Sequence, residues 1–295
     1  MPELPELVGL SSFLQEQLRG QLLTSLQISS FTALKTAQPA PQDAQSRPVQ
    51  AVRRAGKFVD LVLGASPTDD VGLHVVFHLA KAGWVKFRLE DNSGQSASPL
   101  KPGGYLTARL RFEAATLDLT EAGTRRSLAI YVVRSPQDIP GVATLGPDPL
   151  SPSFTLDLLR GILGTRRAQV KGVLRDQRLI AGIGNAYSDE ILHAARLSPF
   201  APSNGLSEEQ LQTLFDCIGS VLAEAIAGAS GKPASELKDA KRSGMRVHAR
   251  TGEACPVCGD TVREVSFADR SLQYCPTCQT GGKLLADRRM SRLLK

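Results

Sequence analysis

The first residues of the chain, Met-Pro-Glu-Leu-Pro-Glu, have the side-chain types that amine chemistry needs. Removal of Met1 would leave Pro2 with a free secondary amine. A terminal amine has a pKa of roughly 7.7–8.0, so about a tenth of it is unprotonated at neutral pH. Such an amine can attack an electrophilic carbon and carry a Schiff base, with Glu3 and Glu6 at hand for proton transfer. The alternative is a processed N-terminus at which Pro5 only opens a helix.

Four of the five cysteines form two Cys-x-x-Cys pairs, Cys255/Cys258 and Cys275/Cys278, with 16 residues between the inner cysteines. Four thiolates at this spacing can close a tetrahedral site around Zn²⁺. Because all four ligands come from the protein, we expect one structural zinc ion. A redox dithiol pair or an iron–sulfur site is the alternative. Cys217 lies in an apolar helical pattern, where a small buried residue fits.

Basic and amide side chains border two glycine turns. Lys57 follows Gly56 and precedes an apolar strand, from which it could reach a phosphate or a reacting sugar; a lysine at a strand edge is the alternative. A Gly-Ile-Gly-Asn turn ends in Asn185, which could cap the next helix and offer its amide to a phosphate. Arg167 and Lys171, upstream of this turn, could approach one phosphate backbone, whereas solvated helix faces would explain such residues equally well.

Composition favours a soluble intracellular protein with an anionic partner. The 295 residues are 42% hydrophobic and carry a net charge of +6. No signal-peptide pattern leads the chain, and no apolar run approaches the ~18 residues needed to cross a bilayer. A positive balance favours nucleic acid, although weakly on its own. We expect a cytoplasmic, nucleoid-associated monomer without a membrane partner.

The elements that must position these residues divide the chain into parts. A helix is predicted over 5–18, and short alternating runs over 21–134 indicate a β-sandwich or barrel. Helical patterns follow, and the stretch 228–246, rich in Gly, Ser and Lys, is predicted to be mobile. The predicted helices beyond the sandwich are 155–163, 166–176, 185–195 and 207–227. The fold class is therefore α+β: an N-terminal β-sandwich with flanking helices, and a helical C-terminal domain with a zinc hairpin.

The motifs together resemble the formamidopyrimidine-DNA glycosylase/endonuclease VIII family, over nearly the whole chain and in the family's order. They are the N-terminal Met-Pro-Glu-Leu-Pro-Glu, Arg-x-Gly-Lys at 54–57, His78-Leu79 before Gly83, Leu-Gly-Pro-Asp-Pro-Leu at 145–150, the helix–two-turn–helix motif from Asp176 to Glu190, and the paired cysteines. The resemblance implies a bifunctional DNA glycosylase and abasic-site lyase that acts on damaged double-stranded DNA. It implies a catalytic β-sandwich domain over 1–148, a helix–two-turn–helix domain over 149–246, a zinc hairpin over 247–280 and a basic tail over 281–295.

Carried over residue by residue, the resemblance gives each candidate a role. Pro2 would attack the deoxyribose C1′ of a flipped nucleotide, with Glu3 as general acid and base. Glu6 would order the site, and Lys57 would contact phosphate and assist β-elimination. Arg270, five residues before Cys275, would grip the phosphates at the lesion and assist δ-elimination. The residues implied to hold nearby phosphates are Arg167, Lys171 and Asn185.

Departures from the family pattern concern the void that a flipped base leaves. Family members commonly fill it with a methionine, an arginine and a phenylalanine; here Lys81 replaces the methionine, Arg134 is the candidate arginine, and no phenylalanine follows. The stretch 228–246 also fails to match the usual loop over 8-oxoguanine. The alternatives are therefore an enzyme acting mainly on abasic sites or oxidised pyrimidines, and a non-catalytic protein of the same fold that binds damaged DNA.

Overall fold

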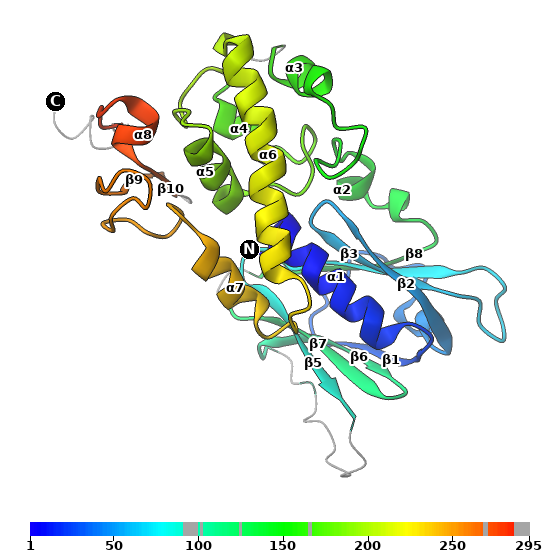
Figure 1. Ribbon diagram of the computed structural model, residues 1–295. Coiled ribbons are helices and arrows are strands. Elements are labelled where there is room, and N and C mark those ends of the chain that lie inside the picture. The colour runs from blue at the N-terminus through cyan, green and yellow to red at the C-terminus, as the bar shows by residue number, and fades with distance from the viewer. Residues whose placement is uncertain (91–99, 101–102, 124–125, 165–166, 268–270, 286–295) are drawn as a thin grey trace. The chain divides into compact units, whose positions relative to one another are not determined.

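The structure is a computed structural model whose chain divides into two compact units (Figure 1). The described residues are 1–90, 100, 103–123, 126–164, 167–267 and 271–285. Unit 1 comprises Met1–Thr144 and Ala229–Ala240, and unit 2 comprises Leu145–Gly228 and Lys241–Lys295. Residues 229–240, which the sequence assigned to the second domain, therefore pack with the first.

Unit 1 is built on eight antiparallel strands in the order β5-β7-β6-β1-β2-β3-β4-β8, which form the predicted sandwich. Its two halves join between β1 and β2, where only two residue pairs are in register. Side chains from both halves fill one apolar core, among them Leu61, Phe77, Leu110 and Leu117. The strands are β1 (Leu22–Ile28), β2 (Arg47–Ala55), β3 (Phe58–Leu63), β4 (Leu73–His78), β5 (Gly83–Leu89), β6 (Leu106–Phe112), β7 (Ala115–Glu121) and β8 (Ala129–Val133).

Helix α1 (Leu4–Leu18) covers this core and runs antiparallel to β2. A proline in the first turn suits the start of a helix because its missing N–H has no intrahelical acceptor there. The Ser11 hydroxyl donates to the carbonyl of Arg53 (3.5 Å), and the side-chain oxygen of Gln15 accepts from the Val52 N–H (2.5 Å). The Gly20 N–H reaches the carbonyl of Val49 (2.8 Å). The N-terminal end of α1 therefore points toward the C-terminal end of β2.

The segment 229–240, predicted to be mobile, is held on unit 1 instead. The indole N–H of Trp84 in β5 donates to the carbonyl of Ala234 (2.9 Å), and the Lys238 ammonium lies 4.9 Å from the indole ring centre. Leu237 is buried in the unit 1 core. A Cβ on Gly9 would lie 3.0 Å from the carbonyl oxygen of Ala229, so α1 has a glycine where this segment approaches. Composition alone did not reveal these partners, since Trp84 lies 150 positions from Ala234.

Unit 2 contains the predicted helices and the cysteine-rich module. Helix α6 meets the minimum length and hydropathy for a membrane-crossing helix, but the core helix of a soluble protein passes the same test. Its buried residues recur at helical spacing on one side, which is typical of a helix that packs one face on protein. The elements are α3 (Leu156–Gly164), α4 (Val170–Arg175), α5 (Asn185–Ala194), α6 (Glu208–Ala229, its end in unit 1), α7 (Leu237–Gly244, shared by the units), β9 (Arg263–Ser266), β10 (Ser271–Tyr274) and α8 (Pro276–Thr280), with α2 (Pro140–Ala143) in unit 1 and short 3₁₀ turns at Pro41–Ala44, Pro136–Asp138 and Ser203–Gly205.

Candidate active site and nucleic-acid interface

The N-terminal residues of unit 1 form a buried, hydrogen-bonded start to α1. Pro2, Glu3 and Glu6 are all buried. The carboxylate of Glu6 accepts the backbone N–H of Glu3 at 2.8 Å, which fixes the chain where it enters the helix. The positive end of the helix favours a carboxylate at this place. Glu6 therefore orders the N-terminus through this hydrogen bond. Glu3 is the carboxylate nearest in sequence to the Pro2 nitrogen.

Lys57 and His78 lie together across neighbouring strands. Gly56 has a φ of +53°, which lets the chain turn tightly before Lys57. Phe58, the next residue, pairs with His78 in the β3–β4 ladder, and their rings lie 4.9 Å apart. Burial and the positive charge of Lys57 lower the pKa of His78 to about 4, so the imidazole is neutral at physiological pH. Lys57 is itself buried and places a cation at this end of β3.

The ladder registers bring the N-terminus and Lys57 to one edge of the unit 1 sheet, which we call the catalytic edge. Helix α1 runs antiparallel to β2, so its start lies toward the turn between β2 and β3, where Lys57 is found. His78 ends β4 and pairs with Ala129, the first residue of β8. The catalytic edge therefore combines Pro2, whose amine becomes free when Met1 is removed, with carboxylates and a buried ammonium group.

We expect His78→Gln to make unit 1 more resistant to acid. A histidine whose pKa is lowered on folding stabilises the protein above its unfolded pKa of 6.5, and that contribution is lost as the pH falls through about 4. The difference between the folded and unfolded pKa values corresponds to about 3 kcal/mol of folding free energy. Urea unfolding at pH 7 and pH 4, followed by the emission of Trp84, should show a smaller loss of stability in the variant. Equal losses in both proteins would mean that His78 titrates normally.

The void-filling candidates are not brought together. Lys81 is exposed in the tight turn between β4 and β5, at the catalytic edge. Arg134 instead follows the other end of β8, where its guanidinium lies 3.6 Å from the carboxylate of Asp69. The described residues that precede β8 at the catalytic edge are 122–123 and 126–128, and Arg126 among them is exposed. The Arg125-Arg126 pair, between two apolar runs, was the signal that sequence reasoning missed. Residues 124–125 lie outside the described part.

In unit 2, Asn185 does not cap α5. Gly184 is the N-cap, and Asn185 is the first helical residue. Gly182 has a φ of +89°, as the tight turn requires. The side-chain amide of Asn185 donates to the carbonyl of Ser271 in β10 (2.8 Å), and its buried oxygen has no hydrogen-bond partner among the described residues. Asn185 thus joins the helix–two-turn–helix region to the zinc hairpin. Arg270, which precedes Ser271 in the sequence, lies outside the described residues.

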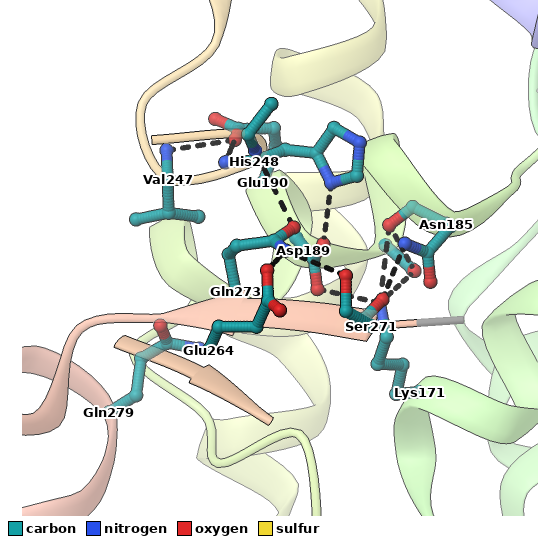
Figure 2. Close-up of polar contacts among 12 residues, drawn as sticks. Lys171, Asn185, Asp189, Glu190, Val247, His248, Glu264, Ser271, Gln273 and Gln279 are labelled. Carbon is teal, nitrogen blue, oxygen red and sulfur yellow. Dashed lines mark hydrogen bonds and ion pairs between the residues drawn. The ribbon is translucent and has the colours of Figure 1, made fainter. Parts of the chain in front are cut away.

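Lys171 is buried rather than presented to a ligand (Figure 2). Its ammonium group donates to the carboxylate of Asp189 (2.6 Å), to the hydroxyl of Ser188 (2.7 Å) and to the carbonyl of Asn185 (3.2 Å). These acceptors account for the three N–H donors of an ammonium group. The expected direct contact of Lys171 with a phosphate therefore does not fit, because the charge is neutralised inside the unit.

The neighbouring carboxylates of α5 hold the segment that leads into the zinc module (Figure 2). Asp189 also contacts the ring of His248 (2.8 Å). Glu190 accepts the backbone N–H groups of Arg246, Val247 and His248, at 2.8, 3.0 and 2.8 Å. Burial raises the pKa of Glu190, and these three N–H groups oppose the shift. The two acidic residues were noted in the sequence only as part of a family motif.

We expect Lys171→Met to lower the stability of unit 2 by about 3 kcal/mol, because it leaves the Asp189 carboxylate buried without its ammonium partner. Hydrogen exchange of the α5 amides should become faster. Arg167→Met is the matched control, since that guanidinium is exposed, and we expect a change within about 0.5 kcal/mol. If Lys171→Met left exchange unchanged and instead weakened DNA binding with a shallower salt dependence, Lys171 would be a phosphate contact after all.

Arg167 borders a shallow depression of about 420 Å³ in unit 2 and is, among the described residues, the exposed candidate for a phosphate contact in this unit. The other lining residues are Ala168, Gln169, Phe200, Pro202 and Asn204. An exposed guanidinium beside an amide suits a phosphate group. Arg178, by contrast, is paired with Asp176 at 3.1 Å.

The four paired cysteines form the predicted zinc site. The Sγ atoms of Cys255, Cys258, Cys275 and Cys278 all lie within 4.8 Å of one another. Two of these pairs are 3.3 and 3.9 Å apart, close to the edge of about 3.8 Å of a tetrahedron with Zn–S bonds of about 2.3 Å. The ring of buried His193 lies 3.3 Å from Cys255 Sγ and can donate its N–H to this thiolate. The donor set fits one structural zinc ion.

Three family models match consecutive parts of the chain. The formamidopyrimidine-DNA glycosylase N-terminal domain matches residues 1–130, the formamidopyrimidine-DNA glycosylase H2TH domain matches 145–235, and the zinc finger found in FPG and IleRS matches 252–281. The order of the matches follows the order of the sandwich, the helices and the cysteine module. The predicted fold class and zinc site are thus confirmed.

Relatives of known name agree with these models. Formamidopyrimidine-DNA glycosylase of Thermus thermophilus is 33% identical over 293 residues, which cover 96% of this chain and 100% of the relative. An uncharacterized formamidopyrimidine-DNA glycosylase-like protein of Mycobacterium tuberculosis is 62% identical over 156 residues, 53% of this chain and 98% of the relative. The crystal structure of the MutM (Fpg) protein of Thermus thermophilus matches with a TM-score of 0.78 at 31% identity, covering 96% of this chain and 100% of that chain.

Proposed function

The chain belongs to the formamidopyrimidine-DNA glycosylase family, and we propose that this DNA glycosylase of base excision repair is also an abasic-site lyase whose nucleophile is the amine of Pro2. The observation that supports the proposal most is the catalytic edge, where the start of α1 and the buried Lys57 meet at one end of the sheet. Damaged double-stranded DNA is the proposed partner.

The proposed reaction begins with a flipped nucleotide, because a base inside a duplex cannot be reached. The amine of Pro2 attacks C1′ of the sugar, and the bond from C1′ to the base breaks, with the electron pair and a proton going to the leaving base. Glu3 supplies and removes protons at the sugar as its ring opens and the Schiff base forms. Loss of a proton from C2′ then breaks the C3′–oxygen bond, and loss of a proton from C4′ breaks the C5′–oxygen bond in a second elimination; the electron pair of each broken bond leaves with a phosphate.

Cations assist both eliminations by stabilising the departing phosphates. Lys57 is the buried cation at the catalytic edge, and we propose it for the first elimination. Arg270, outside the described residues, is proposed for the second. The zinc ion takes no part in the bond changes; its four thiolate ligands would hold the β9–β10 hairpin.

Trapping by borohydride tests the proposal, because the reductant converts a Schiff base into a stable amine. Duplexes with an abasic site, 8-oxoguanine, formamidopyrimidine or a 5-hydroxypyrimidine should be compared, since the preferred lesion is part of the question. We expect a covalent adduct with at least one duplex, and mass spectrometry should locate it on the N-terminal peptide. DNA binding without an adduct on any lesion would overturn the proposed lyase, and the absence of base release from every lesion as well would favour a non-catalytic damaged-DNA-binding protein.

A further inference from the structure

Phe31 is the most exposed large apolar residue in the described part of the chain, with 98% of its surface in contact with solvent. It stands in the turn between β1 and β2. Single exposed apolar residues are common, so exposure alone identifies no function. The position of this aromatic ring relative to the catalytic edge decides what it can do.

The ladder contacts place the Phe31 turn at the catalytic edge. Downstream of the turn, the Ile130 N–H donates to the carbonyl of Ala33 (2.7 Å), and the Lys35 N–H donates to the carbonyl of Ile130 (2.9 Å). These bonds make a parallel bridge between Leu34 and Ile130, so the two segments run in the same direction here. Residues before Ala33 therefore extend past the start of β8. Because β8 begins beside His78, Phe31 lies at the end of the sheet where Lys57 and Lys81 are found.

The turn that carries Phe31 is fastened on both sides. Ser29 donates its backbone N–H to the carbonyl of Thr107 (2.9 Å) and its hydroxyl to the carbonyl of Leu106 (2.6 Å). The Ala33 N–H closes the turn on the carbonyl of Ser30 (3.0 Å). The ring is thus presented on a preorganised turn, which lowers the entropy lost when it binds.

Charge around the ring suits a phosphate backbone. Lys35 follows the turn, Lys81 comes from the β4–β5 turn and Arg126 from the segment before β8, and all three are exposed. Cationic side chains bind the backbone without reading sequence, whereas aromatic rings stack on bases. Basic groups on neighbouring turns around one projecting aromatic ring therefore favour DNA as the partner of this surface.

We propose that Phe31 inserts into the base stack at the lesion and stacks on the base left unpaired by the flipped nucleotide; the proposal rests on the function proposed above. Extruding a nucleotide leaves a gap, and proteins that distort DNA fill such gaps with apolar side chains. The ammonium of Lys81 would have to shed its water to enter the stack, which is costly without a charged partner. The ring of Phe31 carries no such penalty.

The test uses a duplex with a tetrahydrofuran abasic analogue, which cannot form a Schiff base, opposite 2-aminopurine. Binding of the unmodified chain should change the 2-aminopurine emission. Phe31→Ala should abolish that change and weaken binding about tenfold. Phe31→Trp should restore both, and its own emission should be quenched on binding. The single native tryptophan, Trp84, is buried and provides a constant background.

Leu89→Ala is the matched control, because Leu89 is 65% exposed and ends β5 at the end remote from Gly83 and the Lys81 turn. It should bind and signal like the unmodified chain. Unchanged binding and 2-aminopurine emission in Phe31→Ala, with no quenching in Phe31→Trp, would overturn the insertion. Trapping on a true abasic site in the same proteins separates the two proposals: quenching without an adduct contradicts only the lyase, and an adduct without quenching contradicts only the insertion.

Discussion

A chain in which Pro2 is replaced by leucine is expected to form no borohydride-trapped adduct with abasic DNA. A large second residue prevents removal of Met1, so the free amine moves one residue away from its place beside Glu3. Pro2→Gly allows removal of Met1 and keeps an amine of similar pKa at the right position, but it lacks the ring that fixes the nitrogen. A misplacement of about 1 Å can cost about 100-fold in rate, and we expect at least that loss in single-turnover trapping.

Two measurements make this result specific. Pro5→Ala changes the other proline at the start of α1 and leaves the terminal amine intact, so its trapping rate should stay close to that of the unmodified chain. Intact mass determines whether Met1 is present in each variant. A full yield of adduct from Pro2→Leu with Met1 retained would assign the nucleophile to a lysine and would refute the role of Pro2.

The parts of the fold and site that the sequence predicted depend on local patterns. The start of α1 was predicted because proline and glutamate have defined preferences in a first helical turn. The zinc site was predicted because ligand spacing within each Cys-x-x-Cys pair is itself a geometric constraint. The alternating strands of unit 1 were predicted because one face of each strand is buried.

Sequence patterns say least about side chains whose partners are distant in sequence. Asn185 looked like a helix cap, but its amide bonds a carbonyl 86 positions away. Lys171 looked like a phosphate contact because a sequence pattern shows the charge of a lysine and not the buried carboxylate that neutralises it. The position of Arg134 depends on the strand register, which places it at the end of β8 remote from His78.

The same limitation hid Phe31. The notable property of this residue is its place at the catalytic edge, and that place follows from a parallel bridge between Leu34 and Ile130. Neither propensity nor spacing encodes such a bridge, because each partner alone reads as an ordinary apolar residue. Register between distant segments thus decides which residues surround the start of α1, while local sequence decides their chemistry.

The largest loss of stability is expected from Cys275→Ser, which removes a fully buried zinc ligand. Structural zinc sites contribute about 10–16 kcal/mol of apparent binding free energy at pH 7, and much of it is folding free energy. Zinc content should fall from one ion per chain to nearly none, and the amides of β9 and β10 should exchange rapidly. Cys217→Ser is the matched control, since this thiol in α6 is not a member of the cluster.

The pH dependence of zinc binding follows from the thiols themselves. Burial raises the pKa of Cys275 to about 11 and also raises that of Cys278, so without metal both are protonated at neutral pH. Zinc must displace these protons, and the affinity should therefore fall as the pH falls. Zinc release with a colorimetric chelator at pH 6 and pH 8 checks the direction.

Two outcomes of Cys275→Ser are informative. Retention of zinc, with protected β9 and β10 amides, would show that three thiolates and another donor suffice. Loss of both zinc and binding to abasic DNA would show that the hairpin beside Asn185 must be rigid to bind the lesion.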